Sequence, residues 1–290
     1  MWVSKNWKDY RLLDASDGDR LELWGKYSLI RPDPQVIWKN AKKHPLWQKA
    51  DAGYRRSRSG GGAWSENRLP EKWTIGYGDL RFVIKPMGFK HTGLFPEQAT
   101  NWDWFSDLIR NAGRPIKVLN LFAYTGGATV AAASAGASVC HVDAAKGMVQ
   151  AAKENAALSG LADAPIRYIV DDCKKFIERE LRRGNRYDAI IMDPPSYGRG
   201  PNGEIWKLEE QISDFLALAV QVLSDKPLFV LLNSYTTGLS AATMGYLLRM
   251  AMAKRGGTVA AEEIGLPVTA TGGTLPCGAS ARWTAGEDEQ

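Results

Sequence analysis

The sharpest chemical signal in the sequence is the run Asp193-Pro194-Pro195-Ser196-Tyr197. Two prolines fix φ and lack an amide N–H, so carbonyl oxygens remain as acceptors beside the Asp193 carboxylate. A planar amine or amide edge can dock against such acceptors, with Tyr197 as a stacking wall. The run therefore predicts that Asp193, Pro194, Pro195 and Tyr197 form a catalytic wall facing an acceptor group. The alternative is a rigid proline turn without chemistry.

A second signal combines a glycine turn with an acidic residue. The turn is Tyr124-Thr125-Gly126-Gly127-Ala128-Thr129, and Asp143 follows 17 residues after Gly126. Glycines let the backbone approach a ligand closely, and a carboxylate at the end of the next strand can accept hydrogen bonds from both ribose hydroxyls of an adenosine. The pair predicts an adenosine-bearing cofactor. Asp143 also suits a helix N-cap, and that alternative stays open.

A third acidic position, Asp171-Asp172, follows another apolar segment. One of these carboxylates can accept a hydrogen bond from the amino group of an adenine. Capping of the helix that starts near Cys173 is an equally simple explanation.

The elements that position these residues form an alternating series. Apolar segments at 117–122, 138–143, 166–171, 187–192, 228–232, 258–264 and 281–283 predict strands, and segments 128–135, 146–159, 173–183, 208–223 and 241–254 predict helices. Strands joined by helices imply a doubly wound α/β sheet of seven strands, Rossmann-like and covered on both faces. Ligands bind such sheets past the carboxyl ends of the strands, and the acidic residues above occupy those ends.

The first part of the chain has a different character. Residues 1–115 hold 20 Lys and Arg against 13 Asp and Glu, together with nine of the eleven tryptophans, whereas residues 116–290 hold 17 against 19. We therefore divide the chain into a basic, Trp-rich, β-rich substrate-recognition region, 1–115, and a cofactor-binding catalytic domain, 116–290. Phosphates bind Lys and Arg and unpaired bases stack on aromatic rings, so the first region predicts an RNA-facing element. A solvated basic face around a Trp-rich core is the alternative.

Within the first region the pattern predicts short strands at 11–15 and 20–29, a hairpin of 73–77 with 80–85 around Gly78-Asp79, and a helix at 102–111. Residues 39–71 show no clear pattern. They include a basic, glycine-rich stretch, 54–62, that suits either phosphate binding or a mobile surface loop.

Composition excludes several classes of protein. No apolar run is long enough to cross a membrane, and residues 1–10 lack the apolar core of a signal peptide. The three cysteines, Cys140, Cys173 and Cys277, lack metal-site spacing, which predicts a cytosolic protein without a metal. The turn at Gly126 lacks the third glycine of a dinucleotide fingerprint, which disfavours a nicotinamide-dependent oxidoreductase. Nothing in the sequence indicates the oligomeric state.

Beyond these patterns, the chain resembles the class I S-adenosylmethionine-dependent methyltransferases of the bacterial large-subunit (23S) ribosomal RNA group. The resemblance rests on NLFAYTGG, HVDAAKGMVQAAKENAALSGL, DDCKKFI and YDAIIMDPPSYGRGPNGEIWK, with FKHTGLFPEQ upstream, and covers about residues 85–235. The branches it resembles most methylate cytosine at carbon 5 or guanine at nitrogen 7. The resemblance implies a methyltransferase fold, S-adenosylmethionine as cofactor and ribosomal RNA as partner.

The resemblance also assigns roles by position. Thr125 to Gly127 would line the methionine end of the cofactor, Asp143 would hold its ribose and Asp172 its adenine. The full set of expected cofactor contacts is Phe122, Tyr124, Thr125, Gly126, Gly127, Asp143, Ala144, Asp171, Asp172, Cys173 and Gln98. The expected substrate contacts are Lys90, Phe95, Asn233 and Arg199, with Lys90 and Gln98 on a lid. Lys207 and residues 55–58 are further candidates for phosphate contacts.

One departure from the family pattern concerns the methylated atom. Methylation at carbon 5 of a pyrimidine requires a thiolate that adds to carbon 6. The cytosine branch carries a cysteine just after strand five, where this chain has Asn233-Ser234-Tyr235. Cys277, expected between the last two strands, is the remaining candidate for a nucleophile. We therefore favour a nitrogen acceptor. The alternatives are carbon-5 transfer through Cys277, a protein or small-molecule acceptor, and a non-catalytic RNA-binding module.

Overall fold

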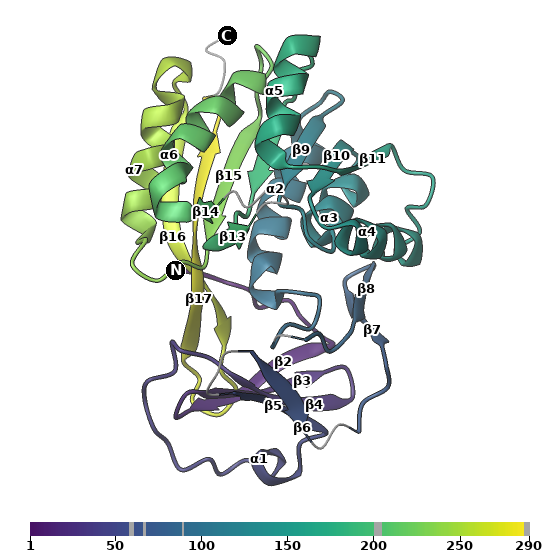
Figure 1. Ribbon diagram of the computed structural model, residues 1–290, viewed down its shortest axis with the longest axis vertical. Helices are drawn as coiled ribbons and strands as arrows, with labels where there is room; N and C mark the ends of the chain where they lie inside the picture. Colours follow the sequence, from purple (N-terminus) through teal and green to yellow (C-terminus); the bar gives the residue numbers. More distant parts are fainter. Residues whose placement is uncertain (58–60, 66–67, 89, 200–204, 287–290) are drawn as a thin grey trace. The chain divides into compact units, whose positions relative to one another are not determined.

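The structure is a computed structural model that describes residues 1–290 except 58–60, 66–67, 89, 200–204 and 287–290 (Figure 1). The chain forms two compact units. The first contains Met1–Thr100 and Ile264–Cys277, and the second contains Asn101–Glu263 and Gly278–Gln290. This division differs from 1–115 and 116–290: it gives most of helix α2 (Ala99–Asn111) to the second unit and a later segment, Ile264–Cys277, to the first.

Most of the second unit's strands belong to a large mixed sheet whose strand order is β1-β16-β17-β15-β12-β9-β10-β11, of which β1 and parts of β16 and β17 fall in the first unit. The strands are β9 (Lys117–Leu121), β10 (Ser138–Asp143), β11 (Ile166–Val170), β12 (Ala189–Met192), β15 (Phe229–Ser234), β16 (Thr258–Pro267) and β17 (Thr274–Thr284). Strands β11, β10, β9, β12 and β15 are parallel, and β17 runs antiparallel to β15. The predicted doubly wound α/β sheet is confirmed. The seven expected strands are present, and β1 (Trp2–Val3) extends the sheet beside β16.

Helices cover both faces of this sheet. They are α2, α3 (Gly127–Ser134), α4 (Lys146–Leu158), α5 (Cys173–Arg183), α6 (Leu208–Ala219) and α7 (Ala241–Met252), with short 3-10 turns η2 (Val220–Val222) and η3 (Ala253–Arg255). Strand residues alternate in direction, so Leu119, Ile190 and Leu232 join one apolar cluster with α5, α6 and α7. On the other face Phe105 of α2 stacks on Phe229, with ring centroids 5.8 Å apart.

The first unit is mostly β structure. One sheet has the order β2-β3-β4-β5-β6, formed by β2 (Tyr10–Ser16), β3 (Asp19–Trp24), β4 (Tyr27–Pro32), β5 (Ala52–Arg56) and β6 (Gly62–Ser65). A separate hairpin joins β7 (Trp73–Tyr77) to β8 (Leu80–Ile84), with Tyr77 paired to Leu80 around the expected Gly78-Asp79 turn. The unit also holds a one-turn helix, α1 (Leu46–Lys49), and a 3-10 turn, η1 (Pro96–Gln98). The β-rich character of this part of the chain is confirmed.

Three expectations for individual segments were wrong. The segment 20–29 is two strands, because Gly25 adopts φ 63° and turns the chain between β3 and β4. The segment 39–71 contains β5 and β6, which lack a regular apolar alternation because both strands are short and mix apolar residues with Gly, Ser and Arg. Cys277 lies inside β17 rather than in the connection before it, because β17 starts at Thr274. The basic stretch 54–62 is partly strand, and residues 58–60 of it lie outside the described residues.

Candidate active site

The turn that follows β9 has an unusual backbone. Phe122 and Tyr124 adopt φ values of 55° and 50°, and Gly126 adopts 81°. A left-handed conformation costs a non-glycine residue about 1–2 kcal/mol, so it persists only where the surroundings impose it, commonly at functional sites. Two such residues in one turn indicate that neighbouring residues impose the backbone conformation of the segment between β9 and α3.

Neighbouring side chains hold this turn in place. Asn155 of α4 is buried and its Nδ2 donates to the carbonyl of Thr125 at 2.8 Å. The amide of Phe122 donates to Cys173 Sγ at 3.3 Å. Asn155 was missed from the sequence. The sequence pattern that could have revealed Asn155 is a polar residue on the apolar face of a helix, the face that also buries Val149, Ala152 and Ala156.

Gly126 is required by both conformation and space. A Cβ at this position would lie 2.7 Å from the Cβ of Ala152. We expect Gly126→Ala to lower the free energy of unfolding by about 2–4 kcal/mol, from the left-handed backbone plus overpacking against α4. Urea denaturation followed by circular dichroism measures this change.

A matched control separates the two contributions. Gly160 also has a left-handed φ, 73°, but a Cβ there meets nothing within 4 Å. Gly160→Ala should therefore cost only about 1 kcal/mol, and adding Ala152→Gly to Gly126→Ala should recover part of the loss. Equal losses in both single variants would show that close packing at Gly126 is unimportant.

Asp143 ends β10 beside this turn. Its Oδ2 accepts from the amide of Tyr124 and its Oδ1 from the amide of Ala145, both at 2.8 Å. The second bond closes a turn over Ala144 and does not cap α4, whose N-cap position is Ala145 and has no side-chain cap hydrogen bond, so the N-cap alternative is wrong. Each carboxylate oxygen has two acceptor sites, so these bonds leave acceptor capacity for a ligand hydroxyl. Asp143 thus links the glycine turn to the start of α4, where Ala144 is exposed.

The acidic pair after β11 lies beside Asp143, since the amide of Asp171 donates to the Asp143 carbonyl at 3.1 Å. Asp171 forms an ion pair with Arg179, and the exposed Asp172 caps α5 by accepting from the amide of Lys175 at 2.9 Å. The next residue, Cys173, is buried, and burial raises the pKa of its thiol. Both predicted roles of Asp172 remain compatible with its exposed position.

Asp193 follows β12 on the same edge of the sheet. Its Oδ1 accepts from Asn233 Nδ2 at 2.7 Å, and Asn233 lies in the neighbouring strand β15. Pro194 is buried, and the Pro195 carbonyl accepts from Trp206 Nε1 at 2.6 Å. The structure therefore brings together two predicted residues, Asp193 and Asn233, and shows that the Pro195 carbonyl is already bound within the chain.

Tyr197 lies on a short hairpin just after the prolines. Strand β13 (Tyr197–Arg199) pairs with β14 (Ile205–Lys207), and the Tyr197 side chain is 50% exposed. Trp206 of this hairpin packs on Phe122, with ring centroids 5.7 Å apart. The hairpin thereby connects the proline run to the glycine turn. Nothing is described of the side chain of Arg199.

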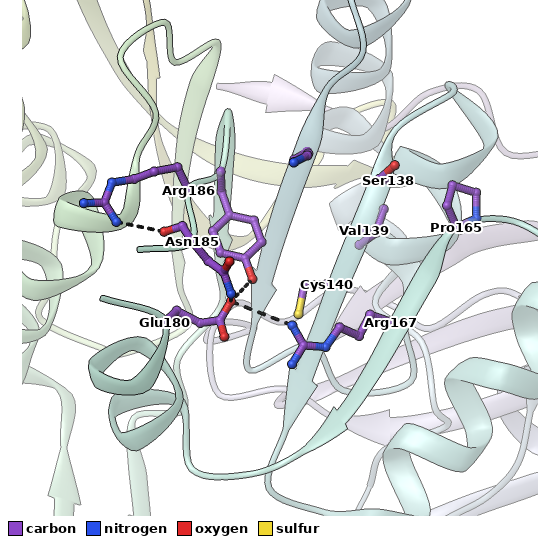
Figure 2. A pocket seen from close by; sticks show the side chains of 10 residues that line it. Ser138, Val139, Cys140, Pro165, Arg167, Glu180, Asn185 and Arg186 are labelled. Atoms are coloured by element: carbon purple, nitrogen blue, oxygen red, sulfur yellow. Dashed lines mark hydrogen bonds and ion pairs between the residues drawn. The ribbon is translucent and has the colours of Figure 1, made fainter. Parts of the chain in front are cut away.

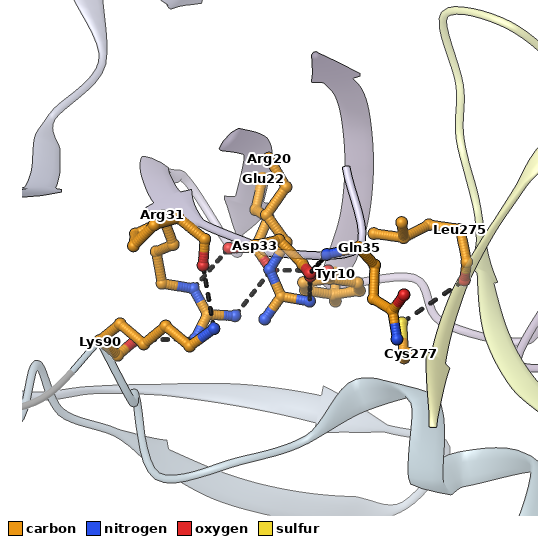
Figure 3. Close-up of polar contacts among 10 residues, drawn as sticks. Tyr10, Arg20, Glu22, Arg31, Asp33, Gln35, Lys90, Leu275 and Cys277 are labelled. Carbon is orange, nitrogen blue, oxygen red and sulfur yellow. Dashed lines mark hydrogen bonds and ion pairs between the residues drawn. The ribbon is translucent and has the colours of Figure 1, made fainter. Parts of the chain in front are cut away.

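Several predicted residues belong to the first unit: Lys90, Phe95, Gln98 and Cys277. Lys90 Nζ donates to the Pro32 carbonyl at 3.0 Å (Figure 3), and burial together with the nearby Arg20 lowers the pKa of Lys90 to about 8. The Phe95 ring meets His91 edge-on, and the amide of Gln98 donates to the Phe95 carbonyl at 3.0 Å. The lid role predicted for Lys90 and Gln98 and the substrate contact predicted for Phe95 stay predictions.

Cys277 has the surroundings of an unreactive thiol. Its Sγ donates to the Leu275 carbonyl at 3.5 Å (Figure 3). Burial and the nearby carboxylate of Glu97 raise the pKa of the Cys277 thiol, so the thiolate required of a nucleophile is disfavoured. Cys140, in β10, is a buried core thiol as expected, with its pKa raised to about 11 by burial.

The buried cations of the first unit are already paired. Burial alone would raise the pKa of Glu22, but the guanidinium groups of Arg20 and Arg31 lower it to about 2. Arg31 binds Glu22 through Nε at 2.6 Å and Nη2 at 2.8 Å (Figure 3). The tryptophans pack in a similar way: the indole N–H of Trp64 donates to the Met87 carbonyl and that of Trp47 to Asp14. Arg20, Arg31, Trp47 and Trp64 therefore stabilise the first unit itself.

A cavity of about 240 Å³ lies at the amino ends of the parallel strands of the large sheet (Figure 2). Its lining includes Lys117 and Ser138, which begin β9 and β10, whereas the predicted site lies where those strands end. Glu180 in this cavity accepts from Tyr187 Oη at 2.6 Å and from Asn185 Nδ2 at 2.9 Å. This cavity is therefore separate from the site built around Asp143 and Asp193.

His141 is fully buried in β10 behind the glycine turn. Thr129 Oγ1 accepts from Asn120 and lies 2.9 Å from His141 Nδ1. Burial lowers the pKa of His141 to about 4. Because the unfolded state has a pKa near 6.5, the unfolded chain binds more protons below that pH, and stability falls as the pH drops from about 6.5 towards 4.

We expect this histidine alone to remove about 2–3 kcal/mol of stability between pH 7.5 and pH 4.5. The measurement compares urea unfolding of the wild type and His141→Gln at both pH values. The stability advantage of the wild type should shrink by that amount at the lower pH. An unchanged difference would mean that His141 titrates normally in the folded protein.

A family model described as S-adenosylmethionine-dependent methyltransferase matches residues 15–208. The chain belongs to this family. A solved SAM-dependent methyltransferase from Agrobacterium tumefaciens is 39% identical, with a TM-score of 0.92 over 98% of this chain and 93% of that chain. SMU.776, a methyltransferase solved in complex with SAH, has the same fold at 19% identity, with a TM-score of 0.74 over 97% of this chain and 76% of that chain.

Curated relatives match part of this methyltransferase. The protein named Ribosomal RNA large subunit methyltransferase K/L from Shewanella frigidimarina (strain NCIMB 400) is 33% identical over 161 residues, which is 55% of this chain and 22% of that protein. The chain thus spans about a fifth of the length of the curated relatives it matches.

The residues at the carboxyl edge of the sheet suit the cofactor of this methyltransferase family. S-Adenosylmethionine presents ribose hydroxyls and an adenine amino group, which are donors, and a positively charged sulfonium. The edge presents acceptors, the carboxylates of Asp143, Asp171 and Asp172, together with the carboxylate of Asp193. The hydrogen-bond acceptors at this edge therefore match the donors of the cofactor. Among the described residues no cluster of His, Cys, Asp or Glu could hold a metal ion, and no helix is long and apolar enough to cross a membrane.

Proposed function

We propose that this methyltransferase transfers a methyl group to a nitrogen atom of a base in ribosomal RNA. One observation carries the proposal: the carboxylate of Asp193 stands after β12, next to a two-proline turn, and is held by the Asn233 amide at 2.7 Å. A carboxylate in that place accepts a hydrogen bond from an amine or amide edge, as transfer to nitrogen requires. Nothing in that position supplies the thiolate that transfer to carbon 5 requires.

The cofactor side of the proposal assigns three roles. Asp143 accepts hydrogen bonds from the ribose hydroxyls, and Asp172 accepts from the adenine amino group. Thr125 to Gly127 line the methionine end. The remaining proposed cofactor contacts are Phe122, Tyr124, Ala144, Asp171, Cys173 and Gln98. Bound S-adenosylmethionine supplies an electrophilic methyl group on its sulfonium.

On the acceptor side the enzyme mainly has to align a nitrogen lone pair with that methyl group. Asp193 and the Pro194 carbonyl accept hydrogen bonds from the base edge, and Asn233 orients Asp193. Tyr197, half-exposed on the β13–β14 hairpin, offers a ring on which a flipped base can stack, and Phe95 is a second candidate. Lys90, Arg199 and Lys207 are proposed phosphate contacts.

The RNA substrate is proposed on two grounds. The Shewanella relative is named a ribosomal RNA large subunit methyltransferase, and the first 115 residues of this chain carry an excess of Lys and Arg. After the paired Arg20 and Arg31 are set aside, Arg55 and Arg56 of β5 are exposed cations of this region. The cytosolic location predicted from the cysteine content belongs to the same proposal.

RNA binding should therefore weaken steeply with salt. For single strands the slope of log K against log salt is about −0.7 per phosphate neutralised, so Arg55→Gln/Arg56→Gln should make the slope less steep by about 1.4. Fluorescence anisotropy with ribosomal RNA fragments across a salt series measures it. The matched control is Arg182→Gln/Arg186→Gln, which removes two exposed cations, one in the last turn of α5 and one just after it. Salt-independent binding, or equal effects of both pairs, would count against RNA recognition by β5.

Transfer to carbon 5 of cytosine through Cys277 is the second candidate. The raised pKa of the thiol argues against it. Incubation with RNA containing 5-fluorocytosine decides the matter: a nitrogen methyltransferase leaves the protein at its own mass on a denaturing gel, whereas a covalent protein–RNA adduct that Cys277→Ala abolishes would overturn the nitrogen assignment.

The most direct test of substrate and atom is mass spectrometry of nucleosides from digested ribosomal RNA. RNA from cells lacking the gene should lose one base-methylated nucleoside, and the purified enzyme with S-adenosylmethionine should restore it in vitro. If every RNA nucleoside is unchanged, the acceptor is a protein or a small molecule, or the chain is a non-catalytic RNA-binding module.

A further inference from the structure

Behind Asp193 lies a continuous row of buried hydrogen bonds that reaches a cation. Arg282 donates through Nε at 3.0 Å and through Nη2 at 2.8 Å to Asn101 Oδ1. Asn101 Nδ2 donates to Ser280 Oγ at 3.0 Å, and Ser280 Oγ donates to Asn233 Oδ1 at 2.7 Å. Asn233 Nδ2 then donates to Asp193 Oδ1 at 2.7 Å. The row, which we call the Asn101–Ser280 relay, joins a guanidinium to a carboxylate.

The placement follows from strand alternation. Leu232, Ala281 and Trp283 point into the apolar cluster beneath α5, α6 and α7. Their neighbours Asn233, Ser280 and Arg282 therefore point to the opposite face, which α2 covers. Asn233 pairs with Ser280 across β15 and β17, so the two side chains are adjacent on that face. Asn101 reaches them from the first turns of α2.

The relay lies in a protected environment. Asn101 and Ser280 are 0% exposed, and Asn233 is 1% exposed. Arg282 stacks over the Trp104 ring of α2 at 4.8 Å. Burial lowers the pKa of Arg282 to about 9, so the guanidinium remains protonated at neutral pH. A hydrogen bond in such surroundings is electrostatically stronger than one in water, and bonds in a row polarise one another.

The direction of the bonds decides which way the Asn233 amide faces. Each group in the row donates toward Asp193, and Ser280 presents its hydroxyl proton to Asn233 Oδ1. With its oxygen taken by Ser280, the amide presents its nitrogen to Asp193. A flipped amide would place oxygen against the Asp193 carboxylate, which repels it. The orientation of Asp193 thus depends on Ser280 and Asn101, which are linked to that carboxylate through Asn233.

We propose that Asn101, Ser280 and Arg282 are positioning residues that hold the Asn233 amide toward Asp193 and so fix the carboxylate that receives the acceptor nitrogen. This inference rests on the proposed function at Asp193. It adds three residues on β17 and α2, none of which belongs to a motif in the sequence, to the machinery of the same site.

A double-mutant cycle in the full chain tests the inference. Ser280→Ala should lower kcat for ribosomal RNA by about 10-fold, with the Kd for S-adenosylhomocysteine unchanged. The same substitution in an Asp193→Ala background should have no further effect on kcat, because its effect passes through Asp193. A purely structural role predicts the same loss in both backgrounds. The matched control is Ser106→Ala, which removes another buried hydroxyl, one that donates to the Ala131 carbonyl and lies outside the relay.

Asn101→Asp separates the relay from simple attachment of α2. An aspartate keeps the acceptor for Arg282 but loses the donor toward Ser280, so the relay account predicts the kcat loss of Ser280→Ala with an unchanged melting temperature. If Asn101 serves only to anchor α2 to Arg282, Asn101→Asp should retain full kcat, and that result would overturn the inference.

A measurement without substrate keeps the inference testable should methyl transfer to RNA fail. Nuclear magnetic resonance of the Asn233 side-chain amide, assigned through its loss in Asn233→Ala, should show slow hydrogen exchange in the wild type. Exchange should become at least about 10-fold faster in Ser280→Ala and remain slow in Ser106→Ala. Fast exchange in the wild type, or no change in Ser280→Ala, overturns the relay, whereas an inactive wild type with a protected amide overturns only the proposed function.

Discussion

Replacing Asp193 with alanine is expected to lower kcat by about 100-fold or more and to change the Kd of S-adenosylhomocysteine by less than about twofold. The carboxylate is held by Asn233 at 2.7 Å in the proposed acceptor site, and loss of an orienting contact to the reacting group costs on this scale. Transfer of labelled methyl groups to ribosomal RNA from cells lacking the gene measures kcat, and isothermal titration calorimetry measures cofactor binding.

Asp193→Asn provides the control for shape, because the amide keeps one acceptor oxygen and the size of the side chain. It should lose less activity than Asp193→Ala. Asp214→Ala removes an exposed carboxylate from α6 and should behave as the wild type. Full activity of Asp193→Ala would remove the basis of the proposed acceptor site.

Replacing Asp143 with alanine should produce the reverse pattern, a rise of about 150-fold or more in the Kd of the cofactor. Two hydrogen bonds from ribose hydroxyls to a charged acceptor are lost, each worth about 1.5–3 kcal/mol. The amides of Tyr124 and Ala145 also lose their acceptor, so the glycine turn loosens. At saturating cofactor, kcat should recover to within a few fold of the wild type.

Two comparisons decide whether Asp143 binds the cofactor or merely caps the turn. Asp143→Asn keeps an acceptor oxygen for one of the two amides and should weaken cofactor binding less than alanine does. Thermal unfolding without cofactor reports the structural loss by itself. If Asp143→Ala lowers the melting temperature but leaves the cofactor Kd unchanged, the carboxylate serves the turn alone.

The large sheet was predictable because its signals are local. Buried parallel strands read as short apolar runs, and the amphipathic period of 146–159 and 173–183 marks the helices between them. The residues at strand ends could also be placed at one edge, since parallel strands share the edge at which they end. Asp143 and Asp193 were found in this way.

The less regular parts were not predictable for the opposite reason. Strands β5 and β6 are short, with the sequences AGYRR and GAWS, so no alternation of apolar residues reveals them. The turn at Gly25 depends on a single left-handed residue inside an otherwise continuous strand pattern. The basic, Trp-rich composition of the first part of the chain suggested an RNA surface, but Arg31 and Trp64 turned out to pair and pack internally.

The sequence by itself determined the α/β architecture, the class of cofactor and the two acidic strand ends, because each of these is written in residues close together along the chain. Only the tertiary structure decided what supports Asp193. Asn101 and Ser280 are 179 positions apart and meet solely because α2 packs over the face on which β17 presents Ser280. A hydrogen bond between residues that distant leaves no local periodicity, so it becomes visible only when the sheet and its covering helix are assembled.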